Sequence, residues 1–478
     1  MSTTPGGAGG GGDHGSTEKN SNNSSSNNKS SSGGSSGDGL VVARRSLPGE
    51  RRQVRFRTHF VNTVVDVMTH MGWQQVSGND DWDMHWCDVA WARDSFDGRK
   101  LPDHARICHF PTHYELTRKD HVAKNLKKMK RKLEREEGKK AATRCDFMPE
   151  TFWLPHDYRM FVEDFKRKPG TIWIAKPVGS AQGKGIFLVS KLSELMAFKR
   201  DKRFDHQQEG EERQLAYIVQ RYLQRPYLIG GKKFDLRIYI LVTSYNPLCF
   251  WLYREGFARF SGAPFSMEDL SNAFVHLTNV AIQKKAADYD KSKGCKWLMS
   301  QVKRYLVARH GRAAVKQFLR DVDNIILTSL QAVQPVMFSD KHCFELYGFD
   351  ILIDADLKPW LIEVNASPSL TADTASDYNL KYGMLEDMFT VVNIDNRFGA
   401  WFSHTVGERG RERSRERSRE RSREVEREVE REREKRDKRQ AQFDTHTHSA
   451  LLCLCLSLSV SRSRCFALLC SCMQASWR

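Results

Sequence analysis

Two apolar segments in the last third of the chain carry polar side chains that could bind a divalent cation. Glu363 and Asn365 are separated by one residue, so on a strand both side chains face the same side of the sheet. Asp350 lies in a similar segment and could supply a third oxygen. Mg²⁺ prefers such ligands and completes its shell with phosphate and water. We predict a magnesium site here; the alternative is an ordinary strand end with solvated polar residues.

A lysine and a glycine-containing loop farther upstream suit contact with phosphate. Lys176 ends a strand-like segment, and the loop after it contains Gly183 and Gly185. Backbone amides can approach an anion closely where no Cβ intervenes. The loop lacks the P-loop pattern, and no kinase signature follows it. By itself the pattern leaves a nucleotide contact and an ordinary turn both open.

Further polar groups lie between these two regions. Residues 220–223 end a strand-like segment, where backbone groups could bind an adenine. Lys233, Asp235 and Arg237 then alternate along the start of another strand, and residues 278–279 add small polar groups. The alternative for the alternating set is one exposed face of an edge strand.

These residues need a framework of strands and helices to bring them together. Between residues 171 and 370, segments rich in β-branched and aromatic residues alternate with helical patterns, which predicts an α+β catalytic unit. The predicted strands are Thr171–Ala175, Gly185–Val189, Tyr217–Leu223, Phe234–Thr243, Phe250–Tyr253, Gly348–Ile353 and Trp360–Val364. The predicted helices are Leu192–Phe198, Lys296–Val307 and Arg312–Ala332.

Composition divides the chain into four parts. Residues 1–45 are rich in Gly, Ser and Asn and are expected to be disordered. Residues 52–160 form a predicted N-terminal subdomain, and 165–395 hold the central and C-terminal catalytic subdomains. Residues 405–478 form a low-complexity Arg/Glu tail whose alternating end we interpret as a gene-model artefact.

The net charge of +17 favours an acidic partner. Residues 118–140 are strongly basic, and apolar residues three and four apart predict an amphipathic helix within them. That helix could steer an acidic peptide, although an ordinary solvated basic face is an equal alternative. No nucleic-acid reading module is recognisable. Scattered cysteines argue against a disulfide framework or a zinc site, and no apolar segment is long enough for membrane insertion, so a soluble intracellular protein is expected.

Motifs over about residues 55–395 resemble the tubulin tyrosine ligase-like family in type and order. They are Trp-Ile-Ala-Lys-Pro, Gln-Gly-Lys-Gly-Ile, Gln-Arg-Tyr-Leu, Lys-Phe-Asp-Leu-Arg, His-Leu-Thr-Asn and Leu-Ile-Glu-Val-Asn-Ala-Ser-Pro-Ser-Leu. The upstream segments Asn-Asp-Asp-Trp and His-Phe-Pro-Thr-His-Tyr-Glu-Leu-Thr-Arg-Lys-Asp resemble the polyglutamylase branch.

The resemblance implies an ATP-grasp fold and an ATP- and magnesium-dependent ligase that adds glutamate to tubulin. The implied catalytic residues are Arg237 and Glu363, and the implied metal ligands are Asp350, Glu363 and Asn365. The implied contacts with the amino-acid substrate are Arg259, Lys296 and Lys381. The implied ATP contacts are Lys176, Gln182, Gly183, Gln220, Arg221, Tyr222, Leu223, Lys233, Asp235, Thr278 and Asn279.

Several members of the family carry arginine where this chain has Ser180 or Lys184, so the phosphate-loop contacts are the part of the match that departs from the pattern. A glycine ligase of the same family is an alternative, as is a catalytically silent microtubule-binding protein. The resemblance further implies acidic tubulin tails and free L-glutamate as partners, with possible companion subunits. It places the protein in the cytoplasm and cytoskeleton, at the cilium, basal body or flagellum.

Overall fold

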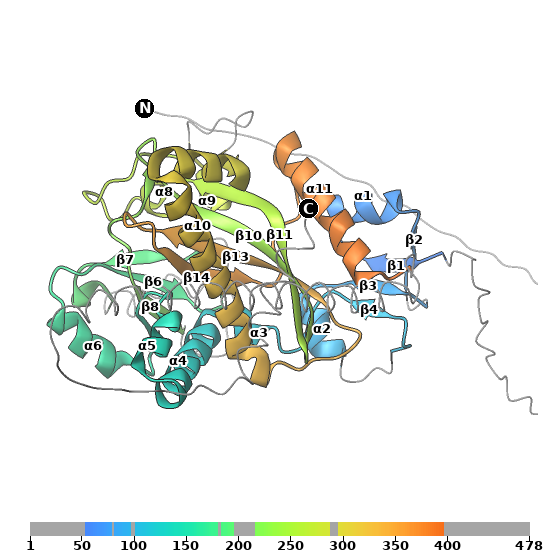
Figure 1. Cartoon of the computed structure of the whole chain (residues 1–478), viewed down its shortest axis with the longest axis horizontal. Helices are drawn as coiled ribbons and strands as arrows, with labels where there is room; N and C mark the ends of the chain where they lie inside the picture. The colour runs from blue at the N-terminus through green and yellow to red at the C-terminus, as the bar shows by residue number, and fades with distance from the viewer. Residues whose placement is uncertain are drawn as a thin grey trace, which may run out of the picture. The chain divides into compact units, whose positions relative to one another are not determined.

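The computed structural model describes residues 53–78, 81–96, 101–179, 183–195, 216–286 and 295–395 (Figure 1). The predicted disordered segment 1–45 and the low-complexity tail 405–478 lie outside these residues. Within the described part, helices and strands are mixed, and the predicted α+β class is confirmed.

A long antiparallel sheet forms the centre of the fold, because its strands contribute many buried β-branched and aromatic residues. Its order is β12 (Lys296–Leu298), β11 (Leu248–Phe260), β10 (Lys232–Tyr245), β13 (Glu345–Ile353) and β14 (Pro359–Asn365), with β9 (Leu228–Ile229) paired to β10. Every residue of β13 is buried. Helix α10 (Met299–Val333) packs into one hydrophobic core with this sheet, and α11 (Ala375–Val392) packs into another (Figure 1).

Helix α10 agrees with the prediction of two helices in this region, because Gly311 has a non-helical conformation (φ 79°, ψ 163°) and separates the two predicted segments. The start of the first helix differs. Residues Lys296–Leu298, predicted as the start of a helix, instead form β12, which pairs with β11. The pairing partner across the sheet decides this conformation, and a local helical pattern cannot reveal it.

A second, parallel sheet is built from the N-terminal residues. Its order is β2 (Gln74–Gln75), β1 (Arg55–Thr58), β3 (Met84–Trp86) and β4 (Arg106–Ile107). Helix α1 (Thr63–His70) follows β1, and α2 (Val89–Ser95) follows β3. Each helix begins at a side-chain cap, since Asn62 accepts from the Val64 amide and Asp88 from the Trp91 amide.

A third sheet has the order β5 (Thr151–Leu154), β8 (Tyr217–Arg221), β6 (Trp173–Pro177) and β7 (Phe187–Val189). Helix α6 (Tyr158–Arg167) buries Phe161 against it, beside the fully buried Trp173. Because β5 pairs with β8, this sheet begins before the boundary predicted between residues 160 and 165.

The predicted basic helix is α4 (Lys119–Glu136), which buries Val122, Leu126 and Leu133 and exposes most of its cations. The remaining short helices are α3 (Tyr114–Thr117), α5 (Lys139–Ala142), η1 (Thr143–Cys145), α8 (Ala273–His276), α9 (Val280–Gln283) and η3 (Gln334–Val336). Among the described helices, none combines the length and the apolar character needed to cross a membrane.

Replacing Gly311 with alanine tests the kink in α10. A Cβ at this position would meet no atom within 4 Å, so any effect comes from the backbone conformation alone. That conformation is nearly restricted to glycine, and we expect Gly311→Ala to lower the free energy of unfolding by about 1–3 kcal/mol. Arg312→Ala, at the next exposed position, is the control and should change it by less than about 0.5 kcal/mol. Equal losses of unfolding free energy for the two variants in chemical denaturation would show that the Gly311 conformation does not require glycine.

Candidate active site

One cleft collects most of the predicted site residues. It is lined by strand ends of the central and third sheets and by the segment around α8 and α9. The predicted residues in its wall are Lys176, Gly183, Gln220, Arg221, Tyr222, Leu223, Lys233, Asp235, Arg259, Thr278, Asn279, Asp350 and Glu363. Arg237, Asn365, Lys296 and Lys381 are not part of the wall, and Gln182 lies outside the described residues.

The floor of the cleft is a buried set of charges on three neighbouring strands. Asp350 on β13 faces Arg237 on β10 in register, and its carboxylate accepts from Nε at 2.6 Å and from Nη2 at 3.1 Å. Arg259 on β11 adds a contact from Nη2 at 2.7 Å. Arg259 also pairs in register with Asp235 and donates to its carboxylate. Two carboxylates and two guanidinium groups thus form one bonded unit.

The two carboxylates of this unit have different proton affinities. Burial opposes ionisation of Asp350, but the charges and hydrogen bonds of Arg237 and Arg259 outweigh it and hold the pKa of Asp350 well below its usual value. Burial raises the pKa of Asp235, which shares only Arg259 and feels the charge of Asp350. Asp350 is therefore the permanently charged member.

This geometry excludes the edge-strand alternative for the alternating residues of β10. The strand lies between β11 and β13 in the middle of the sheet. Lys233 and Asp235 are buried, and only 11% of the Arg237 side chain is exposed. Buried charges need partners of opposite charge. Asp235 has Arg259 as its partner, and Arg237 has Asp350.

Lys176 lies on the third-sheet side of the cleft, completely buried. Its Nζ donates to Oε1 of Gln220 at 2.7 Å, and the Gln220 amide donates to the Thr151 hydroxyl at 2.9 Å. Burial lowers the pKa of Lys176 to about 8, partly offset by the charges of Glu363 and Asp350. The amine is thus fixed in place and easily deprotonated.

A chain of hydrogen bonds fixes the second buried lysine. Lys233 Nζ donates to the Tyr222 hydroxyl at 3.0 Å and to the His276 carbonyl at 2.8 Å. His276 Nε2 must carry a proton, because its partner at 2.8 Å is the carbonyl of Asp269. Nδ1 of the neutral ring then accepts from Tyr222 at 3.0 Å. Burial, and next the charge of Lys176, lowers the pKa of Lys233 to about 7.

The loop after β6 approaches the opposite wall closely at Gly183. Its φ is +78°, and a Cβ there would lie 2.5 Å from Cδ1 of Ile282 on α9. A larger residue would therefore be strained and would push Ile282 aside. Glycine at this position lets the backbone lie close to α9 and line the cleft, and the phosphate contact of this loop stays a prediction.

Lys119 is a site residue that the sequence analysis did not identify. It lines the cleft, and its Nζ lies 3.2 Å from Oε2 of Glu363. It is the first residue of α4 and belongs to the Leu-Thr-Arg-Lys-Asp segment. The motif was visible in the sequence, but nothing local indicates that this lysine meets β14.

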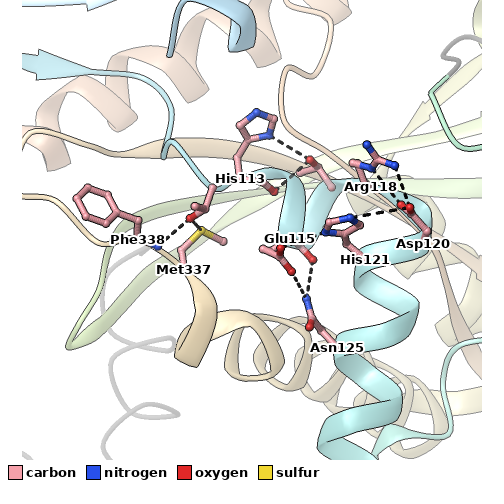
Figure 2. Close-up of polar contacts among 10 residues, drawn as sticks. His113, Glu115, Arg118, Asp120, His121, Asn125, Met337 and Phe338 are labelled. Atoms are coloured by element: carbon pink, nitrogen blue, oxygen red, sulfur yellow. Dashed lines mark hydrogen bonds and ion pairs between the residues drawn. The ribbon is translucent and has the colours of Figure 1, made fainter. Parts of the chain in front are cut away.

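Polar contacts join α3 and α4 at the corner where α4 begins with Lys119 (Figure 2). Arg118, the single residue between the helices, donates from Nε and Nη2 to Asp120 at 3.1 and 2.9 Å. Glu115 on α3 contacts His121 and Asn125 on α4 at 3.1 and 2.9 Å. Asn125 is buried, and its amide also donates to the Glu115 backbone carbonyl at 3.1 Å, so both of its acceptors belong to Glu115.

The predicted metal ligands lie next to one another on β13 and β14. Asp350 pairs in register with Glu363, and Gly348 pairs with Asn365. The Asn365 amide donates to the Gly348 carbonyl at 3.1 Å, which leaves its oxygen as the free acceptor. No group of three or more His, Cys, Asp or Glu side chains suited to a metal occurs in the described part of the chain. Two carboxylates and an amide still fit Mg²⁺, which takes further ligands from phosphates.

The other predicted substrate residues form a second charged cluster beside Arg259. Lys296 on β12 is its neighbour in register. The Lys296 ammonium contacts Asp373 at 2.9 Å and Asp377 at 2.7 Å. Lys381 on α11 shares Asp377 at 3.0 Å and donates to the Thr371 carbonyl at 2.6 Å.

The buried lysines predict a pH dependence of nucleotide binding. A phosphate favours the ammonium form, so affinity for ADP should fall as pH rises above about 7, where free Lys233 loses its proton. Titration calorimetry between about pH 7 and pH 9 should show up to about a tenfold loss per pH unit. Lys233→Met should bind weakly and remove the dependence between about pH 7 and pH 8. Lys232→Met, the control, should keep it; a flat wild-type profile would contradict this assignment.

The α3–α4 corner predicts a stability effect. Glu115→Ala leaves the buried Asn125 amide without its side-chain partner, and we expect a loss of about 1–3 kcal/mol in the free energy of unfolding. Glu134→Ala on the exposed face of α4 is the control and should cost less than about 0.5 kcal/mol. Chemical denaturation compares them, and equal losses would show that Glu115 does not brace the corner.

Comparison with known proteins agrees with this site. The chain is 49% identical over 374 residues to the probable tubulin polyglutamylase TTLL9 of Bos taurus, covering 73% of this chain and 81% of that protein. It is 45% identical over 358 residues to the probable tubulin polyglutamylase ttll-9 of Caenorhabditis elegans, covering 74% and 84%. The probable alpha-tubulin polyglutamylase Ttll1 of Tetrahymena thermophila is 41% identical over 360 residues, covering 72% and 87%.

Residues 98–398 match the tubulin-tyrosine ligase family. The match includes the strands that carry the charged floor, both buried lysines and the metal-ligand candidates. It confirms the predicted ATP-grasp class and the resemblance to the polyglutamylase branch. The chain belongs to the tubulin-tyrosine ligase family.

Proposed function

We propose that this chain is an ATP- and magnesium-dependent ligase that adds glutamate, through an isopeptide bond, to the γ-carboxyl of glutamates in tubulin tails. The observation that carries the proposal is the cleft, which is lined by two buried lysines and by the adjacent residues Asp350 and Glu363. The names of the relatives, all tubulin polyglutamylases, support the substrate.

The first step is transfer of the ATP γ-phosphoryl group to the acceptor carboxylate, which gives an acyl phosphate and ADP. Lys176 on β6 and Lys233 on β10 are each held by hydrogen bonds and would stabilise the phosphate oxygens. The backbone at Gly183, together with the predicted contact Gln182, would cover the phosphates. Residues 220–223, at the end of β8, would bind the adenine.

Asp350, Glu363 and the Asn365 oxygen would hold Mg²⁺ at the phosphate end of the cleft. A bound Mg²⁺ supplies charge neutralisation for the phosphoryl group. Glu363 is the least buried of these groups, with 21% of its side chain exposed, and Lys119 balances its charge. Arg237 keeps Asp350 ionised and oriented, which is the catalytic role we assign to it.

In the second step the amine of free glutamate attacks the acyl phosphate and releases phosphate. Arg259, Lys296 and Lys381 would bind the carboxylates of the incoming amino acid. Each already contacts a carboxylate of the protein, so a dicarboxylic substrate would enter a network arranged for such groups. Glycine, the substrate of the alternative ligase, would use fewer of these cations.

Helix α4 connects the cleft to a basic surface. It begins at Lys119 beside Glu363 and exposes further cations along its length, namely Lys124, Lys128, Arg131, Lys132 and Arg135. An acidic tubulin tail along this face would place one glutamate near Glu363, and the net charge of +17 fits that partner. A cytoskeletal location in the cytoplasm follows, with the cilium, basal body or flagellum as the expected site and companion subunits as expected partners.

Labelled-glutamate incorporation into microtubules tests the function. With ATP and Mg²⁺ we expect the wild type to incorporate glutamate, and Glu363→Gln to lose at least about a hundredfold because it removes a ligand charge from the phosphoryl site. Glu268→Gln, at an exposed position, is the control and should retain activity. Incorporation of glycine would overturn the substrate. No incorporation of either amino acid, in cell extract as well as with purified protein, would favour a silent microtubule-binding protein.

Lys296 tests amino-acid binding separately. Lys296→Met should raise the KM for glutamate by about 10–100-fold, the range for a lost charge-assisted hydrogen bond, and leave the KM for ATP nearly unchanged. Lys284→Met is the matched control, because Lys284 also contacts Asp373 but is more exposed. An equal rise for ATP and glutamate would show that Lys296 acts on the whole cleft.

A further inference from the structure

A second cavity lies in the N-terminal sheet and shares no lining residue with the catalytic cleft. Its volume is about 490 Å³, within the range of small-molecule sites. Its wall contains residues from the ends of β1, β2 and β3 and from α2.

The topology of the sheet places this cavity at a topological switch point, where the connections from two adjacent strands run in opposite directions along the sheet. All pairings among β1–β4 are parallel, and the strand order is β2-β1-β3-β4. The chain leaves β1 toward β2 on one side and leaves β3 toward β4 on the other (Figure 1). Thr58 is the last residue of β1 and His59 follows it, while Cys87 and Asp88 follow the carboxyl end of β3. In open parallel sheets, ligands bind in this crevice.

Arg57 supplies the charge that a ligand there would meet. Its Nη1 is buried and donates to no acceptor in the described part of the chain. The nearby Asp88 is committed elsewhere, since it accepts from the Trp91 amide at 2.7 Å and lies 3.7 Å from His59 Nε2. A buried guanidinium nitrogen without a partner is costly, and a bound anion would satisfy it.

The rest of the wall indicates the size and shape of the ligand. Val76 and Trp91 contribute half-buried apolar surface, and the Trp91 ring packs edge-on against His85 at 4.3 Å between centroids. Thr58 and Ser77 add hydroxyl groups. We propose that this cavity binds a small organic anion, whose carboxylate or phosphate contacts Arg57 and whose apolar body lies against Val76 and Trp91.

Binding of matched probes to the full chain tests the proposal, and variants of the cavity wall separate this cavity from the catalytic cleft. Titration calorimetry compares benzoate, phenyl phosphate and the cation benzylamine. We expect saturable binding of at least one anion and none of benzylamine. Benzoate alone would identify a carboxylate site, and phenyl phosphate alone a phosphate site. Absence of binding by both anions, or equal binding of benzylamine, would overturn the proposal.

Substitutions in the wall of the cavity test whether the anion binds there. Arg57→Gln should weaken anion binding at least tenfold, whereas Arg55→Gln should not, because Arg55 pairs with Asp81 and does not line the cavity. Ser77→Phe, at an exposed position of the wall, blocks the cavity independently if Arg57→Gln fails to fold. Unchanged affinity in the folded Arg57 variant, or in Ser77→Phe, would place the anion elsewhere and contradict the proposal.

Discussion

The active site depends on one buried carboxylate, Asp350, and on the two arginines that keep it charged. Taking a carboxylate out of water is unfavourable unless its charge is compensated. Arg237 and Arg259 reach it from two different strands, so compensation requires that β10, β11 and β13 pair in one register. A shift of either strand by one residue would turn these side chains to the opposite face. The buried charge of Asp350 therefore also specifies the pairing of these strands.

The three lysines of the site are held around these charges by separate sets of contacts. Lys176 and Lys233 are buried on hydrogen-bonded supports, and their lowered pKa values make them responsive to an incoming phosphate. Lys119 is the first residue of α4, and polar contacts of Arg118 and Glu115 stabilise the corner between α3 and α4. Since the three lysines come from α4, β6 and β10, the cleft is complete only when the central sheet, the third sheet and α4 are packed together.

Local sequence patterns predicted the positions of strands and the face on which their side chains lie. The alternation of Glu363 and Asn365 placed both side chains on one face, and the strands that carry Lys176, Asp350 and Glu363 lie where their composition indicated. Long-range pairing was not predictable in the same way. The family resemblance implied separate catalytic, substrate and metal roles for Arg237, Arg259 and Asp350, whereas both arginines contact Asp350 directly. The Lys119–Glu363 contact and the strand at Lys296 depend on partners far away in the chain.

The energetic coupling between Arg259 and Asp350 tests most directly whether the charged floor acts as one unit. The free energy of unfolding would be measured for Arg259→Gln, Asp350→Asn and the double variant. We predict a coupling energy of about 1–3 kcal/mol, with the double variant less destabilised than the sum of the single ones, because either single change leaves a buried charge uncompensated. Additive losses, within about 0.5 kcal/mol, would contradict the account.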